Sequence, residues 1–148
     1  MTVKQTRGRI VVGVDSSEQS RRALRWAVRQ AELTGADVEA VLAWEPPFSG
    51  WGSRVPAVEE QALADIAGKV LAESIEKAVG VEVPVEITAR VEEGTAAQVL
   101  LKAAAADDVR LLVVGSRGVG GFTGALLGSV GQHCAQHAPC SVVIVRDR

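Results

Sequence analysis

The sequence is poor in features that would place it outside a cell or in a membrane. It has two cysteines, Cys134 and Cys140, and no Cys-x-x-Cys pair, so we expect reduced thiols and no disulfide framework. No stretch reaches the roughly 18–20 apolar residues that a membrane-spanning helix needs. The first apolar run, residues 10–14, is too short for the core of a signal peptide. These absences lead us to expect a cytoplasmic protein without a membrane partner.

Neither sign of charge dominates the chain. Sixteen Lys and Arg residues stand against eighteen Asp and Glu residues, for a net charge of -2. A nucleic-acid-binding domain usually carries a basic stripe, so nucleic acid is not an expected partner. The 148 residues, 47% of them apolar, suffice for one domain with a proper core. We see no linker and expect a single domain over residues 1–148, with its core at about 9–146.

Short apolar runs alternate with longer amphipathic segments. The runs predict strands at residues 10–14, 38–44, 83–91, 111–114 and 142–145. The segments between them predict helices at 16–33, 57–79, 95–106 and 129–137, and residues 45–56 predict a loop. Ser16 with Gln19, and Thr95 with Gln98, form capping-box patterns at two helix starts. Pro84 predicts that its strand lies at an edge of the sheet.

The resulting order, β-α-β-α-β-α-β-α-β, indicates an α/β fold. Strands without polar alternation, separated by helices, predict an open parallel sheet with helices on both faces. In such sheets ligands bind beyond the carboxyl ends of the strands, near the point where strand order reverses. Two segments leave strands with unusual residues: 13–17, which begins Gly13-Val14-Asp15, and 115–131.

The second of these segments holds seven of the fifteen glycines. Glycine lets a backbone approach a ligand closely, and exposed N–H groups followed by a helix N-terminus form an anion site. No Asp or Glu occurs between Val109 and Arg146. A phosphate site is therefore predicted, with a loop of tight turns as the alternative. The segment is not a P-loop, because Ser129 stands where Lys is needed, and it lacks a dinucleotide fingerprint.

The spacing Gly115-x2-Gly118-x9-Gly128-Ser129 is more specific. It resembles the Gly-x2-Gly-x9-Gly-Ser/Thr signature of ATP-binding universal stress proteins. The first-strand sequence Ile-Val-Val-Gly-Val-Asp and the closing His-Ala-Pro-Cys-Ser-Val-Val-Ile-Val-Arg also look like that family. The resemblance runs over essentially the whole chain.

The resemblance implies a fold and a ligand. The family fold is Rossmann-like, similar to adenine nucleotide alpha hydrolases, with five parallel strands in the order 3-2-1-4-5. The ligand would be ATP or another adenine nucleotide, with Mg²⁺. Asp15 would lie near the ribose or a phosphate-bound metal, and the backbone of Ala43 would meet adenine. The residues expected at the site are Gly13, Val14, Asp15, Ala43, Val114, Gly115, Ser116, Arg117, Gly118, Gly128, Ser129 and Val130.

Two polar features keep alternatives open. Asp15 precedes a predicted helix and could instead cap it. His133 and His137 lie four residues apart, which could place two metal ligands on one helical face. No further ligand cluster is evident, so solvated or packed histidines are expected.

The function expected from this resemblance is nucleotide-dependent regulation of a stress response, acting through binding. No Lys, His or Glu lies in the glycine segment to activate water. The alternative is a slow Mg-dependent ATPase or phosphotransfer enzyme that uses Asp15 and Arg117. Family members commonly pair the edges of their last strands, so a homodimer through residues 142–145 is expected, along with an unknown regulatory protein partner.

Overall fold

The computed structural model describes residues 8–46, 57–117 and 127–146. It contains a parallel five-stranded sheet in the order β3-β2-β1-β4-β5, as predicted. The strands are β1 (Arg9–Gly13), β2 (Asp37–Trp44), β3 (Ile87–Glu93), β4 (Val109–Gly115) and β5 (Ser141–Val145). The helices are α1 (Glu18–Thr34), α2 (Ala57–Val79), α3 (Ala96–Ala104) and α4 (Ser129–His137).

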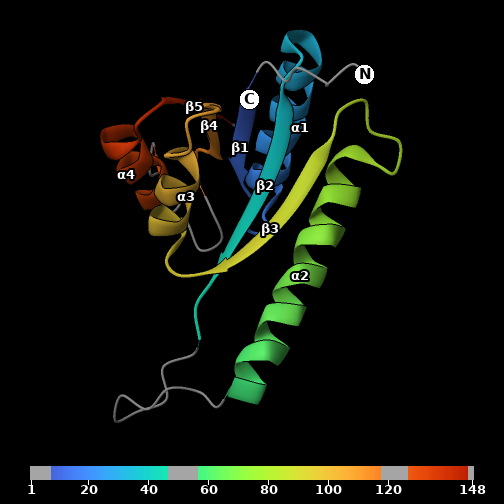
Figure 1. The fold of residues 1–148 in the computed structure, drawn as a ribbon, viewed down its shortest axis with the longest axis vertical. Coiled ribbons are helices and arrows are strands. Elements are labelled where there is room, and N and C mark those ends of the chain that lie inside the picture. The colour runs from blue at the N-terminus through green and yellow to red at the C-terminus, as the bar shows by residue number, and fades with distance from the viewer. Residues whose placement is uncertain (1–7, 47–56, 118–126, 147–148) are drawn as a thin grey trace.

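Helices cover both faces of the sheet because successive strand side chains point to opposite sides. Ile10 and Val12 of β1 belong to a core cluster with α1 and α2, whereas Val11 packs in a second cluster with α3 and α4. Figure 1 shows α3 and α4 near β4 and β5, and α2 running past the carboxyl ends of the strands. The two clusters pack against opposite faces of β1 and β4, which lie in the interior of the sheet.

The start of α1 differs from the prediction. The N-cap is Ser17, in extended conformation, and its side chain accepts a hydrogen bond from the Ser20 N–H. Ser16 has a φ of 73°, and this left-handed conformation differs from the extended one that an N-cap residue adopts. The predicted cap at Ser16 is therefore wrong by one residue. The cap at Thr95 is confirmed, since its side chain accepts from the Gln98 N–H at 3.2 Å.

The third strand also begins later than predicted. Pairing with β2 starts where the Val38 N–H donates to the Glu86 carbonyl at 3.0 Å, and β3 runs from Ile87 to Glu93. Pro84 lies before the strand, since it has no N–H to offer a ladder. The edge position predicted for this strand is confirmed.

Within the described residues, no helix is both long and apolar enough to span a bilayer.

Candidate nucleotide-binding site

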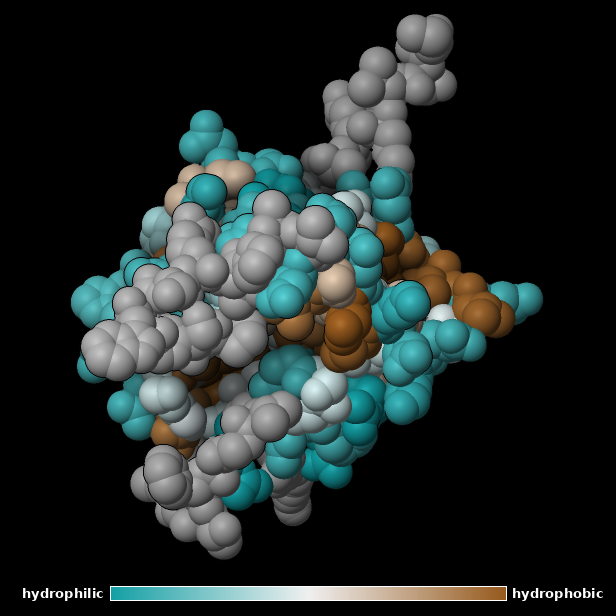
Figure 2. Space-filling view, turned by 90° about the horizontal axis from the view of Figure 1, so that it is seen from below, coloured by the Kyte–Doolittle hydropathy of each residue, from teal (hydrophilic) through white to brown (hydrophobic). Residues whose placement is uncertain are grey.

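A cavity of about 800 Å³ opens at the carboxyl ends of β1, β2 and β4. Figure 2 views the molecule from this end and shows hydrophobic surface between hydrophilic side chains. The cavity lies at the β1–β4 boundary, on either side of which the strand order runs in opposite directions. This is the position at which open parallel sheets bind ligands.

The cavity brings together the predicted site residues that the structure describes. Its walls include Gly13, Val14, Asp15, Ala43, Val114, Gly115, Ser116, Arg117, Gly128, Ser129 and Val130. Gly118, also predicted, lies outside the described residues. Residues as far apart in the sequence as Gly13 and Val130 thus line one space.

Asp15 organises the turn between β1 and α1. Its Oδ1 accepts from the Ser17 N–H at 3.0 Å and from the Ser17 hydroxyl, while its own N–H donates to the Ser20 hydroxyl at 3.2 Å. Ser17 is the cap residue, so Asp15 does not itself cap α1. The carboxylate is instead fixed at the wall of the cavity through its contacts to the cap.

Gly115 ends β4 where the first turn of α1 comes close. A Cβ at this position would lie 3.0 Å from the Gln19 carbonyl oxygen and 3.1 Å from its carbonyl carbon. Such a contact is tighter than nearly all Cβ contacts, so glycine lets the two backbones lie this close without a shift. Gly115 therefore has a packing role that exists without any ligand.

The backbone of Ser116, which follows β4, is hydrogen-bonded to the end of β5 and to the N-cap of α4. Its N–H donates to the Val145 carbonyl at 3.0 Å, and its carbonyl accepts from the Gly128 N–H at 2.6 Å. Both groups are therefore used within the protein, and the residue is buried. Ser116 positions the loop ends, and its N–H is not a phosphate donor.

The first turn of α4 supplies donors that face the cavity. Gly128 is the N-cap, without a side-chain capping bond, and the Gln132 N–H closes the first turn on the Gly128 carbonyl at 3.0 Å. The N–H groups of Ser129, Val130 and Gly131 precede that bond, so they have no partner within the helix. All three residues line the cavity, and a helix N-terminus favours an anion there.

The opposite wall comes from the ends of β2 and β3. Ala43 lies beside Trp44 and Glu45, and the Gly94 N–H donates to the Trp44 carbonyl at 2.9 Å. Gly94 has a φ of 143°, which is why glycine stands there. This wall places Ala43 and Trp44 beside Gly94 at one side of the cavity.

Ten lining residues were not among the predicted site residues, although Leu127 and Gly131 lie in the predicted phosphate segment, 115–131. Gly94 and Ala96 had a signal, a glycine between a strand and a capped helix, whereas Val41 and Leu100 look like any core residue. The full set is Ser20, Val41, Trp44, Glu45, Gly94, Ala96, Leu100, Leu127, Gly131 and Gln132.

A family model described as the universal stress protein family matches residues 6–146. The chain belongs to this family. Among curated relatives, the universal stress protein Rv2623 of Mycobacterium tuberculosis is 34% identical over 139 residues, which cover 93% of this chain and 45% of the relative. A Thermus aquaticus universal stress protein is also 34% identical, with 93% and 97% covered. The chain thus spans about half the length of the mycobacterial relatives it matches.

Solved structures of the family share the fold. The UspA of Lactobacillus plantarum superposes with a TM-score of 0.72 at 19% identity, covering 96% of this chain and 99% of that one. A universal stress protein described as a complex with cAMP gives 0.69 at 28% identity, with 93% and 96% covered. One from Archaeoglobus fulgidus, described as a complex with dAMP, gives 0.57 at 20% identity, with 96% and 98% covered.

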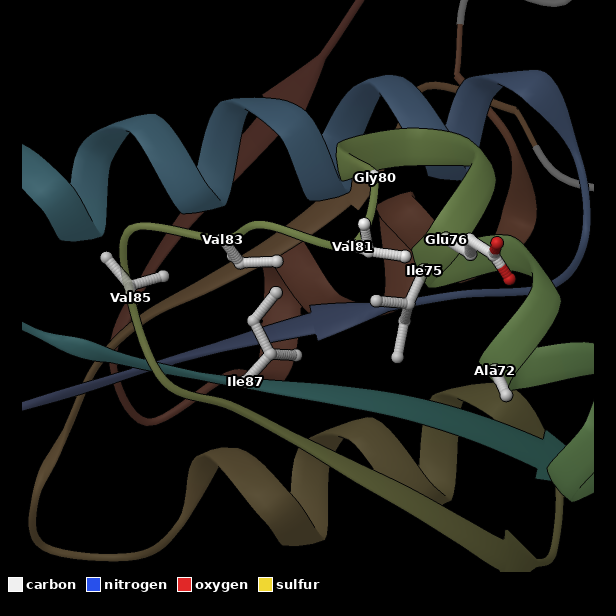
Figure 3. Close-up of a pocket in the computed structure, with 8 residues that line it drawn as sticks. All are labelled: Ala72, Ile75, Glu76, Gly80, Val81, Val83, Val85 and Ile87. Atoms are coloured by element: carbon white, nitrogen blue, oxygen red, sulfur yellow. The ribbon is translucent and has the colours of Figure 1, made fainter.

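A second cavity of this universal stress protein domain, about 360 Å³, lies between the end of α2 and the segment that leads into β3. Figure 3 shows Ile75, Val81, Val83 and Ile87 gathered under the turn that joins them. The one charged residue of its lining is Glu76. Apolar walls without converging polar groups give little to orient a ligand, so the larger cavity is the candidate site.

The two cysteines are free, as expected. Burial raises the pKa of Cys134 to about 11, with the nearby Cys140 adding to the effect, and burial also raises the pKa of Cys140. A thiol that stays protonated at neutral pH is a weak nucleophile and a weak metal ligand. The cysteines thus contribute packing and no evident chemistry.

Proposed function

We propose that this chain binds an adenine nucleotide, ATP or a close relative, in the cavity at the carboxyl ends of the strands. The observation that carries the proposal is the meeting of three features around one space. The N–H groups in the first turn of α4, which have no partner within the helix, offer an anion site, Asp15 offers a fixed carboxylate, and Ala43 lies on an apolar wall.

The phosphates would lie against the first turn of α4. Ser129 and Val130 would donate backbone N–H groups, Gly128 would allow close approach, and the exposed Ser129 hydroxyl could add a further bond. Gly128, Ser129 and Val130 together form what we call the cradle for the phosphates. The signature also includes Gly118, whose contact with the phosphates stays a prediction. Arg117 supplies positive charge at the same wall.

The base and ribose would occupy the wall formed by β1, β2 and β4. Ala43 would meet adenine through its backbone, with Val14 and Val114 beside the nucleoside. Gly13 lines the same wall and leaves room for the Leu100 side chain, which would lie 2.8 Å from a Cβ at that position. The relatives described as complexes with cAMP and dAMP support an adenine ligand. The first of these is the stronger support, because it is 28% identical to this chain.

Mg²⁺ would enter with the phosphates. Proteins usually hold this ion through one or two carboxylates together with phosphate oxygens and water, and Asp15 offers such a carboxylate. No lysine or histidine is among the described residues that line the cavity, and Glu45 lies on the wall opposite α4, which leaves no evident base beside the phosphates. We therefore infer a regulator that acts through binding, and slow Mg-dependent hydrolysis or phosphotransfer is the alternative.

A protein that regulates through nucleotide binding needs a surface whose structure depends on whether the nucleotide is bound. Ser116 links the cradle to β5 through the Val145 carbonyl, and β5 is an edge strand of the sheet. We propose a homodimer through this edge, in the cytoplasm, whose surface changes with nucleotide occupancy and acts on a regulatory protein.

The test compares Ser129→Asp with Ser129→Asn by titration calorimetry with Mg·ATP, AMP and cAMP. A carboxylate at the first helical position suits the helix dipole but repels phosphate, so Ser129→Asp should weaken ATP binding by about tenfold or more, equivalent to roughly 1.4 kcal/mol. Asn has the shape of Asp without its charge, so Ser129→Asn should keep most of the affinity. Phosphate release is measured in the same samples.

Four outcomes are informative. Binding that Asp weakens by about tenfold or more and Asn preserves would support the cradle. Equal affinity in both variants would place phosphates elsewhere, and no adenine nucleotide binding to folded native protein would end the proposal. Multiple turnovers of ATP by the native chain would favour the enzyme alternative.

A further inference from the structure

Two histidines lie one helical turn apart on α4, outside the cavity. His133 and His137 are both exposed, and their ring centres are 4.7 Å apart with 49° between the ring planes. We propose that they bind one Zn²⁺, or a similar late first-row cation such as Ni²⁺ or Cu²⁺, as a two-imidazole chelate completed by water. The proposal does not depend on nucleotide binding.

The geometry suits a shared cation. Residues four apart on a helix project from the same face, and this is the spacing at which paired helical histidines bind zinc. Zinc–nitrogen bonds are about 2.0–2.1 Å long, so two nitrogens on one ion lie at most about 4.2 Å apart. Rings whose centres are 4.7 Å apart can reach that arrangement by side-chain rotation alone. Their exposure leaves room for water ligands.

The surroundings favour an imidazole-binding cation over Mg²⁺ or Ca²⁺. His137 is the last residue of α4, where the helix carbonyls attract positive charge. The segment from Val109 to Arg146 has no Asp or Glu, so the side-chain ligands nearby in sequence are imidazole nitrogens and the thiols of Cys134 and Cys140, which Zn²⁺, Ni²⁺ and Cu²⁺ accept more readily than Mg²⁺ or Ca²⁺ does. Cys134 is fully buried and is not available beside them.

The site is bidentate as far as the structure describes the chain. No group of three or more His, Cys, Asp or Glu side chains arranged to hold a metal occurs among the described residues. Two protein ligands with water make an exchangeable site, in contrast to the closed four-ligand sites that hold structural zinc. The cation would therefore bind reversibly.

Chelation would stabilise a helix that has few local supports. The helix α4 has nine residues, its Gly128 cap has no side-chain bond, and it contains Gly131. Short helices are marginal, and glycine in a helix interior weakens it further. A cation that joins His133 to His137 binds only the helical form, so it would favour that form by mass action.

The test uses nucleotide-free protein and Zn²⁺, Ni²⁺ and Mg²⁺ as probes. Calorimetry should show one Zn²⁺ per chain, similar binding of Ni²⁺ and none of Mg²⁺. Linking two binding groups raises affinity by about 10²-fold or more, so His133→Gln and His137→Gln should each lose about that factor. The matched control is the double variant Ala135→His, His137→Gln. It keeps two histidines on exposed positions but places them two residues apart, on different faces of the helix.

Hydrogen exchange of α4 gives a second readout. Zn²⁺ should slow amide exchange in α4 of the native chain and leave the double variant unchanged. Equal zinc affinity in the native chain and the double variant would overturn the proposal, because the site would then lie elsewhere. Absence of zinc binding to the native chain would overturn it as well. Circular dichroism establishes that each variant is folded.

Discussion

Some single residues at the site have structural roles that the sequence motif does not reveal. Gly115 and Ser116 both fall in the predicted phosphate segment. Gly115 is required by the backbone of Gln19, and the Ser116 backbone is bonded to Val145 and Gly128. A motif of this kind therefore combines residues that would touch phosphate with residues that shape the loop. Substituting Gly115 would test the fold more than the ligand.

Two glycine-to-alanine variants test whether Gly115 is needed for packing, with Gly68 as the control position. Gly115→Ala should lower the free energy of unfolding by about 1–3 kcal/mol, because the methyl group would push against the Gln19 backbone, which must shift to admit it. Gly68→Ala should raise it by about 0.5–1 kcal/mol, since a Cβ at Gly68 meets nothing within 4 Å and the residue lies inside α2. Urea unfolding of both variants measures the difference. Equal stabilities would contradict the packing role of Gly115.

At the scale of elements, the start of α1 offers a test of the corrected cap. Ser17→Ala should cost about 1 kcal/mol of stability, the usual effect of losing a side-chain cap. Ser16→Gly should instead be neutral or stabilising, because glycine accepts the positive φ of 73° more easily than serine. Denaturant midpoints of the two variants provide the measurement. A loss at Ser16 larger than at Ser17 would show that the predicted cap was right.

The elements themselves were largely predictable because their signals are local. Buried strands appear as apolar runs, and Thr95 with Gln98 predicted a helix start that the structure confirms. The errors arose where the three-dimensional arrangement decides between equivalent sequence signals. Ser16 and Ser17 are chemically alike, and the hydrogen bonds of Ser17 with Asp15 and Ser20 make Ser17 the cap. The start of β3 depends on which carbonyl accepts the hydrogen bond from the Val38 N–H, here that of Glu86. No sequence pattern encodes this pairing.

At the scale of the whole molecule, the position of the site followed from topology. A parallel sheet brings the ends of β1 and β4 together, so Asp15 and Gly115 could be expected in one cavity. The expected strand order 3-2-1-4-5 already placed β3 beside β2. The wall from Gly94 and Ala96 was missed because it also depends on how the chain passes from β3 into α3 and reaches the cavity. Apolar residues such as Leu100 pack in the core and also line the cavity. An apolar residue in the sequence indicates only that it is buried, so its place at the cavity could not be predicted.

The edge strand β5 is the feature that bears on assembly. Its residues 142–145 are apolar and only half-buried, and an edge of this kind is a ready template for pairing. The Val145 carbonyl points inward to Ser116. Because backbone groups alternate along a strand, those of Val142 and Ile144 point to the free edge.

Because the Val142 N–H points to the free edge, a substitution that removes it tests the homodimer proposed above. Val142→Pro removes an outward N–H and leaves the inward ladder to β4 intact. Val142→Ala is the control, since it trims the same side chain but keeps the N–H. In a two-fold interface each change counts twice, and each lost hydrogen bond contributes about 0.5–1.5 kcal/mol. Val142→Pro should therefore weaken dimerisation by about tenfold or more, while Val142→Ala should weaken it less. Sedimentation equilibrium measures both, and a monomeric native chain, or equal effects of the two variants, would rule out pairing through the backbone of this edge.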